Sequence, residues 1–218
     1  MNQQLFRMTP LLNGNTMKNR KSTVTRAVSA LLLSLMLAAC GGDSPESMLV
    51  SAKDYLAKND SKAAVIQLKN ALQKKPDLAE ARFLLGKALL DEGNPTASDV
   101  ELRKAAELKY PAEQLVPLQA RAMLLLGQPK KIVDDLAKTQ LTSAESTADL
   151  QTTVGRAHLA LGKPEAAQAA FSAAITAVPG YAPALFGQAR IKAAGRDLPG
   201  ALALLDADAG ALPGMPVR

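Results

Sequence analysis

A pattern of residue size repeats along the chain every 34 or 35 residues, in units that begin at residues 45, 79, 113, 148 and 182. The best-preserved unit is the fourth. It has small residues at its eighth, twentieth and twenty-seventh positions and bulky residues at its eleventh and twenty-fourth, namely Gly155, Ala167, Ala174, His158 and Phe171. Small residues let two helices cross closely, and a fixed period of this length predicts stacked helical hairpins instead of an unrelated helical bundle.

The composition agrees with a helical chain. Apolar residues make up 48% of it, mostly as alanine and leucine, whereas aromatic residues make up only 3% and tryptophan is absent. Small and unbranched apolar residues favour helix over strand. We therefore expect an all-α fold of closely packed helices.

The unit resembles the tetratricopeptide repeat (TPR), which needs small residues where two helices of a hairpin cross and where the next hairpin packs. The resemblance covers about residues 45–214. It implies a superhelical solenoid of about five antiparallel hairpins, over residues 45–78, 79–112, 113–147, 148–181 and 182–214. It also implies a protein that holds partners in a concave groove lined by the first helix of each hairpin.

Two units depart from the pattern. The third has Ile132 where alanine is expected and the polar Thr139 at another small position, so we expect a degenerate hairpin there. In the fifth, Gly195 stands one position before the expected turn glycine. Solenoids generally need a polar capping helix, and none follows the fifth unit. Two alternatives stay open: a partial member of a group of longer proteins, or a dimer formed through the open end.

Residues 17–40 have the parts of an exported leader in the right order. Basic residues at 18, 20, 21 and 26 precede a 13-residue apolar stretch over residues 27–39. That stretch is too short to span a bilayer of about 30 Å and fits a signal peptide. It ends in Leu37-Ala38-Ala39-Cys40, which resembles the lipobox of bacterial lipoproteins. Residues 1–16 fit no part of this leader, so Met17 is an alternative start.

Cys40 is the only cysteine of the chain, so it has no disulfide partner. We expect residues 1–39 to be leader and signal peptide, and residues 40–44 to be a lipidated cysteine with a short tether; the alternative is an incidental cysteine. In Gram-negative lipoproteins an aspartate directly after the cysteine favours the inner membrane. Gly41 stands there instead, which implies the outer membrane, facing the periplasm, with the inner membrane as the less favoured alternative.

The net charge of +6 does not indicate nucleic-acid binding. Residues 1–40 contain five basic residues and no acidic residue, which leaves 21 basic and 20 acidic residues in the rest of the chain. A nucleic-acid site needs its basic surface on the folded domain, and the surplus of charge belongs to the leader. We expect no nucleic-acid partner.

The ninth position of every unit is basic: Lys53, Lys87, Arg121, Arg156 and Arg190. Stacked hairpins would place these charges in a ladder, which suits an acidic polysaccharide, a peptide carboxylate or an acidic protein surface. The fifth position adds apolar residues that suit peptides, namely Leu49, Phe83 and Phe186. Two alternatives stay open. The cations can be inherited from one ancestral unit, or each can pair with an acid one or two helical turns away, such as Glu46, Glu80 or Asp149 at the second position.

The sequence offers little for catalysis. The chain has one histidine and one cysteine, which leaves no Cys/His metal cluster and no nucleophile–histidine arrangement of the usual kinds. His158 stands at a bulky inner position of the fourth unit and is interpreted as a packing residue. We expect neither an enzyme nor a metal site nor a cofactor.

A narrower resemblance rests on three segments: residues 40–46 (CGGDSPE), 63–76 (AAVIQLKNALQKKP) and 182–205. Together with the lipobox, they resemble the TPR lipoproteins of PEP-CTERM/exosortase systems (the PrsT type), which are usually much longer. The resemblance implies a periplasmic scaffold in exopolysaccharide biosynthesis or export. The alternative is an assembly factor for an outer-membrane secretion, pilus or outer-membrane-protein complex.

Overall fold

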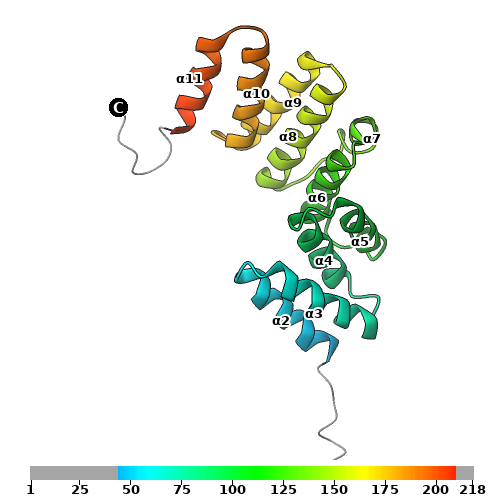
Figure 1. Ribbon diagram of the computed structural model, residues 1–218. Helices are drawn as coiled ribbons and strands as arrows, with labels where there is room; N and C mark the ends of the chain where they lie inside the picture. The colour runs from blue at the N-terminus through cyan, green and yellow to red at the C-terminus, as the bar shows by residue number, and fades with distance from the viewer. Residues whose placement is uncertain (1–43, 210–218) are drawn as a thin grey trace, which may run out of the picture. The chain divides into compact units, whose positions relative to one another are not determined.

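The computed structural model of the chain describes residues 44–209, within which all regular structure is helical (Figure 1). The described helices are labelled α2 to α11 and belong to one unit of structure that begins at Pro45. The expectations for the leader, for Met17 and for Cys40 lie outside the described residues.

The helices form five antiparallel hairpins, each made of an A helix followed by a B helix. The A helices are α2 (Pro45–Ala57), α4 (Ala79–Asp91), α6 (Ala112–Leu125), α8 (Ala144–Ala160) and α10 (Ala182–Ala194). The B helices are α3 (Ser61–Lys74), α5 (Pro95–Glu107), α7 (Pro129–Asp135), α9 (Pro164–Ala177) and α11 (Leu198–Ala209). The B helices begin at intervals of 34, 34, 35 and 34 residues. The all-α hairpin fold predicted from the period is confirmed.

Each turn from an A helix to a B helix contains one residue in the left-handed backbone conformation, always at the fifteenth position of the unit. These residues are Asn59, Gly93, Gly127, Gly162 and Arg196, with φ between 58° and 76°. Gly195 does not serve this purpose. It has a φ of −79° and caps α10, whereas Arg196 takes the left-handed conformation, which is strained for a residue with a side chain. Gly195 therefore ends the helix, and the left-handed turn residue stands at the expected fifteenth position.

The B helices begin with local signals. Asp60 and Asn94 each accept a hydrogen bond from the backbone N–H three residues further on, at 3.0 and 3.1 Å. Proline opens α5, α7 and α9, where the missing N–H would have no partner within the helix. These caps keep the start of each B helix at the same position of its unit.

Two glycines on neighbouring A helices make room for one aromatic ring. Phe171 of α9 is fully buried. A Cβ atom added to Gly155 of α8 would lie 2.6 Å from this ring, and one added to Gly187 of α10 would lie 2.4 Å from it. Carbon atoms pack at about 3.5–4.0 Å, so neither position accommodates a side chain. Phe171 therefore joins the fourth and fifth hairpins as well as the two helices of its own hairpin.

The junction between the second and third hairpins shows how one A helix covers the preceding hairpin. A buried cluster joins α4, α5 and α6 there; it includes Phe83, Leu102, Leu115 and Ala122. The Phe83 ring also stacks on Tyr110, with a distance of 4.3 Å between ring centroids. The side of the second hairpin that faces forward along the chain is thus an apolar surface that the next A helix buries.

The third hairpin differs from the others in its B helix. α7 has 7 residues, whereas the other B helices have 12 to 14. Ile132 is fully buried at the position where the pattern expects alanine. The larger isoleucine side chain fills the space between the helices of this hairpin. The third hairpin is thus irregular, as expected for a degenerate unit.

Glu113, near the start of α6, holds the loop that follows α7. Its carboxylate accepts hydrogen bonds from the Thr142 N–H at 2.6 Å, from the Thr142 hydroxyl at 2.8 Å and from the Ser143 N–H at 3.1 Å. These donors favour the charged form and lower the pKa of Glu113. The Ser143 hydroxyl in turn caps α8, which begins at Ala144, ahead of the unit start expected at residue 148.

Candidate functional site on the A helices

The five basic residues at the ninth position, called here the cation column, lie one on each A helix and are all exposed. They are Lys53, Lys87, Arg121, Arg156 and Arg190. The structure thus brings the same charge to the same face of every hairpin. Their surroundings differ, however, and the differences follow the residue at the second position of the next unit.

Lys53 is neutralised by the next hairpin. Its Nζ lies 2.7 Å from a carboxylate oxygen of Glu80, which holds the second position of the second unit. Both side chains are largely exposed, so this pair contributes little to stability. It nevertheless removes Lys53 as a free positive charge. The expected partner of Glu80 is the cation one or two turns away on its own helix, whereas Glu80 pairs with the cation of the preceding hairpin.

Arg121 and Arg156 lie beside a tyrosine–aspartate pair. The hydroxyl of Tyr181 donates a hydrogen bond to Asp149, the acid at the second position of the fourth unit. Partial burial, and then this bond and the negative charge, raise the pKa of Tyr181 to about 12, while Arg121 and Arg156 act in the opposite direction. The phenol therefore stays protonated at neutral pH and remains a donor to Asp149.

The remaining cations have no acid at the corresponding place. Gln114 stands at the second position after Lys87, and Pro183 stands there after Arg156. Within residues 44–209, Lys53 is the only member of the column in an ion pair; none forms at Lys87, Arg121, Arg156 or Arg190. The second position of the next unit therefore alternates along the column: an acid follows the first and third cations, and none follows the second and fourth.

The apolar residues predicted for the groove have three different environments. Phe186 is 61% exposed, whereas Phe83 is only 6% exposed. The prediction that Phe83 lines the groove is wrong, because α6 and Tyr110 cover its ring. Leu49 is half-buried against the cluster shared by the first two hairpins. Of the three, Phe186 offers a partner the most surface.

His158 behaves as a packing residue, as interpreted from its position. Burial, and then the nearby positive charge of Lys163, lower the pKa of its imidazole, so the ring is neutral at physiological pH. Its Nδ1 is buried and has no hydrogen-bond partner within the described part of the chain.

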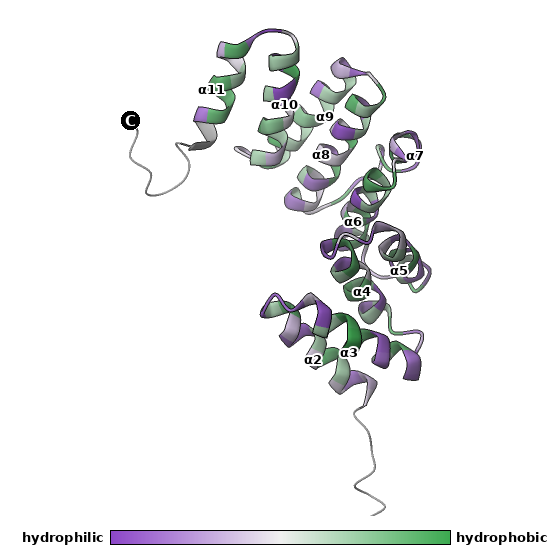
Figure 2. Cartoon of the chain, viewed as in Figure 1, coloured by the Kyte–Doolittle hydropathy of each residue, from purple (hydrophilic) through white to green (hydrophobic). Residues whose placement is uncertain are grey.

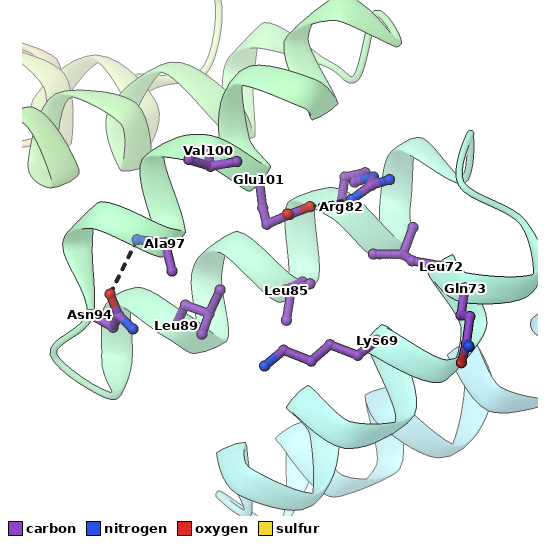
Figure 3. Close-up of a pocket in the computed structure, with 10 residues that line it drawn as sticks. All are labelled: Lys69, Leu72, Gln73, Arg82, Leu85, Leu89, Asn94, Ala97, Val100 and Glu101. Carbon is purple, nitrogen blue, oxygen red and sulfur yellow. Dashed lines mark hydrogen bonds and ion pairs between the residues drawn. The ribbon is translucent and has the colours of Figure 1, made fainter.

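Apart from the cation column, a hollow of about 500 Å³ lies between the first and second hairpins on the side of α3 and α5 (Figure 3). Leu72, Leu85 and Leu89 provide apolar lining. Glu101 and Arg82 form an ion pair of 2.6 Å with side chains only 13% and 15% exposed. The Arg82 guanidinium also donates to the Pro76 carbonyl at 3.0 and 3.1 Å. These bonds engage all three nitrogens of the Arg82 guanidinium, so its role is to fix α4 against α5 and the preceding turn.

The repeat pattern did not reveal the tyrosines beside the cation column. Tyr110 and Tyr181 each follow a B helix, and each lies near the acid at the second position of its own unit, Glu80 or Asp149. A tyrosine at that place after an acid at the second position is the sequence signal that would have found them. The Arg82–Glu101 pair was also missed, since the pattern says nothing of polar partners between helices.

The described residues form neither a metal-binding cluster nor a membrane-spanning helix. Residues 44–209 contain no group of three or more His, Cys, Asp and Glu side chains placed to hold a metal ion. No helix among them is both long enough and apolar enough to cross a membrane.

The hairpin geometry and the repeated A-helix face define a repeat protein that binds other proteins. The family model of the tetratricopeptide repeat matches residues 49–105 and 153–216, which is more than half of the chain. The chain therefore belongs to the tetratricopeptide repeat family. Among curated proteins, no sequence matches it.

Solved structures of similar fold include proteins of several kinds. PilW, a widely conserved type IV pilus biogenesis factor, has a TM-score of 0.66 at 16% identity over 79% of each chain. MamA has a TM-score of 0.64 at 18% identity over 79% of this chain and 98% of its own. YrrB, a TPR protein with an unusual peptide-binding site, has a TM-score of 0.55 at 18% identity over 73% of this chain and 81% of its own. At these identities the likeness concerns the fold.

Proposed function

We propose that this chain is an exported, lipid-anchored TPR scaffold that holds an acidic segment of a partner protein on its A helices. The observation that carries the proposal is the alternation in the cation column. Lys87 and Arg156 lie two hairpins apart, are exposed, and have no acid at the second position of the next unit. A charge that the protein leaves unneutralised on a repeated face is available to a ligand.

An extended acidic peptide fits this surface better than a small anion. Each cation is a single charge on a separate hairpin, so no one hairpin encloses a ligand. The column includes three arginines, which bind carboxylates in a planar, two-bonded geometry. An acidic polysaccharide carries negative charges like those of an acidic peptide, and it is the alternative ligand for this face.

The proposed location at the outer membrane depends on Cys40. The leader before it, the lipobox and the glycine after it support a lipid anchor at the outer membrane, facing the periplasm. A cysteine with two or more acyl chains holds a protein firmly at a membrane. The A helices would then present the cation column to the periplasm.

Two cellular roles are proposed for such a scaffold. The resemblance of residues 40–46 and of the first and last units to PEP-CTERM/exosortase TPR lipoproteins supports a role in exopolysaccharide biosynthesis or export. The likeness to PilW supports the alternative, an assembly factor for a pilus, secretion or outer-membrane-protein complex. Deleting the gene separates them. Loss of secreted polysaccharide with normal pili supports the first role, and the reverse result supports the second.

The binding proposal is tested with charge reversals in the full chain. The double variant Lys87→Glu and Arg156→Glu is compared with Lys62→Glu and Lys131→Glu, which change the net charge equally at exposed residues of B helices. A fluorescent polyglutamate peptide is the probe, at low ionic strength. We expect the first variant to bind at least about tenfold more weakly and the second to bind within about twofold of the wild type. Equal losses in both variants would show that only bulk charge attracts the peptide.

The anchor is tested with Cys40→Ser. Without the thiol no diacylglycerol can be attached, so the protein should leave the detergent phase in a phase-partition experiment. A variant that still partitions with detergent would contradict the lipid anchor.

A further inference from the structure

The forward side of the last hairpin carries an apolar hollow of about 380 Å³ between α10 and α11. Its principal lining, called here the end face, consists of Phe186, Arg190, Leu198, Leu202 and Leu205. Its four apolar members are between 37% and 61% exposed. Figure 2 shows hydrophobic residues along both helices. So many exposed large apolar side chains in one place are characteristic of a binding surface.

The same surface is buried in an earlier hairpin. Phe83 and Leu102 hold in the second unit the positions that Phe186 and Leu205 hold in the fifth. Both of the former are buried under Leu115 and Ala122 of α6. The end face is therefore the surface on which another A helix packs elsewhere in this molecule.

The A helices that cover the first and third hairpins show what such a helix needs. α4 buries Ala81, Leu85 and Ala88, and α8 buries Leu150, Val154 and Ala157. In both helices the buried residues stand at i, i+4 and i+7, which lie on one face of a helix. In both, an acidic residue comes directly before the set: Glu80 in α4 and Asp149 in α8.

The end face belongs to the same series. The twenty-first position of the unit is apolar in the first, third and fifth units, as Val65, Val133 and Leu202. Val65 packs in the cluster that contains Leu85 of the covering helix. Arg190 corresponds to Lys53, which pairs with the acid of that covering helix at 2.7 Å. In charge and in shape, the end face resembles the forward side of the first hairpin.

We propose that the end face binds an amphipathic helix of a partner protein, in which an acidic residue directly precedes small or apolar residues at i, i+4 and i+7. The apolar set fills the hollow between α10 and α11, and the acid pairs with Arg190. This surface is separate from the Lys87 and Arg156 pair, and the proposal does not depend on the function proposed for those residues.

Two other occupants fit the end face less well. A second copy of this chain stacked head to tail would bring α2, whose equivalent positions are Ser47, Ser51 and Asp54. Burying Asp54 where α4 buries Ala88 would place a carboxylate in an apolar site at high cost. Residues 210–218 contain Pro213 and Pro216, and proline in a helix interior removes a hydrogen bond and clashes with the preceding turn.

The test uses the chain's own α4 sequence as a probe. A labelled peptide of residues 79–91, capped at both ends, is titrated with the full chain in a nonionic detergent, and binding is followed by fluorescence anisotropy. The control peptide carries Ala88→Asp, which reproduces the polar residue of α2. We expect the first peptide to bind at least about tenfold more tightly than the second. Equal affinities, or no binding of either, would overturn the proposal.

Variants of the protein locate the binding surface. Leu202→Asp should weaken binding of the α4 peptide about tenfold or more. Leu125→Asp should leave it unchanged, because Leu125 is equally exposed, 62% against 60%, but lies on α6 away from the end face. Arg190→Glu should weaken binding several-fold at low salt, and a peptide with Glu80→Lys should restore it. Failure of this charge exchange would remove Arg190 from the site, and equal effects of the two leucine variants would overturn the proposal.

The competing occupants give distinct results. If the end face pairs with a second copy, the wild type sediments as a dimer and Leu202→Asp sediments as a monomer. If residues 210–218 cover it, deleting them raises the affinity for the α4 peptide about tenfold. Either result would replace the proposed partner helix. A monomer whose affinity does not change on deletion supports it.

Discussion

The third and fourth hairpins have nearly the same period but are stabilised differently. In the fourth, α9 has 14 residues, and the buried ring of Phe171 fills the space above Gly155 and Gly187. In the third, α7 has 7 residues, Ile132 takes the place of the small residue, and Glu113 holds the loop that replaces the rest of the helix. Helix packing gives the fourth hairpin its geometry, whereas one polar side chain completes that of the third.

The two hairpins differ at the end of the B helix and agree at its start. The turn and the start of the B helix keep their places in both hairpins, at Gly127 and Pro129 and at Gly162 and Pro164. The end of the B helix does not. A solenoid therefore tolerates a shortened B helix if the next A helix still begins in register. Here Glu113 holds the residues directly before α8 through its bonds to Thr142 and Ser143.

The largest expected effect comes from removing the central side chain of each hairpin. Phe171→Ala should lower the free energy of unfolding by about 3–5 kcal/mol, and Ile132→Ala by about 2 kcal/mol, since the cost depends on how far the cavity collapses. The loop after α7 can move into the smaller cavity. Urea unfolding followed by circular dichroism measures both. Equal losses would show that the two hairpins are packed alike.

The next prediction concerns the glycine opposite Phe171. Gly187→Ala should lower the free energy of unfolding by about 1–3 kcal/mol through overpacking, even though alanine is favoured by about 1 kcal/mol inside a helix. Gly195→Ala is the matched control, because an added Cβ there would lie 3.4 Å from its nearest neighbour at a negative φ. A stabilised Gly187→Ala variant would mean that Phe171 moves freely.

A smaller effect is expected in the third hairpin. Glu113→Gln should speed amide hydrogen exchange at Thr142 and Ser143 and leave α9 unchanged, because the amide side chain lacks the charge that holds both N–H groups. The pKa of Glu113 lies below its ordinary value of 4.5, so its charged form stabilises the fold at neutral pH. This contribution is lost only as the pH falls through the lowered pKa. Exchange in the wild type at pH 5 should therefore match that at pH 7 after correction for intrinsic rates.

The smallest effect concerns the polar contact of the fourth hairpin. Asp149→Asn should lower the pKa of Tyr181 from about 12, because the hydrogen bond to a charged carboxylate is lost. The pKa of Tyr181 should stay above its ordinary value of 10.0, because burial, the larger cause, persists. Ultraviolet titration in a Tyr55→Phe, Tyr110→Phe background measures this group alone. Asp134→Asn, on α7, should not change it. An unchanged value in Asp149→Asn would show that burial alone raises the pKa.

The sequence predicted the parts of the structure that depend on residue size. Helix type, hairpin number and the weakness of the third unit follow from where glycine, alanine and proline recur. The sequence predicted the burial of individual side chains less well, because burial depends on contacts with neighbouring hairpins. Phe83 and Phe186 hold the same position, yet one is buried and the other open, because within residues 44–209 only Phe83 has another A helix packed over it. Position within a unit therefore does not determine exposure.

The candidate site shows the same limit. The five cations were found from their position alone, but the one ion pair that the described residues form in this column joins Lys53 to Glu80 of the following unit. The contact of Asp149 with Tyr181 joins residues 32 apart in sequence. Such pairs appear only when the stacking of neighbouring hairpins is known.

One ring shared by two hairpins has a consequence for how the stack comes apart. Phe171 is fully buried while both Gly155 and Gly187 lie against its ring, so separating α10 from α9 would expose the side chain at the centre of the fourth hairpin. In repeat proteins the strength of each interface decides which neighbours unfold together. The fourth and fifth hairpins should therefore open as one cooperative block, with the short α7 as its boundary. A partner bound at the C-terminal end would protect the amides of α8 and α9 although it touches neither helix.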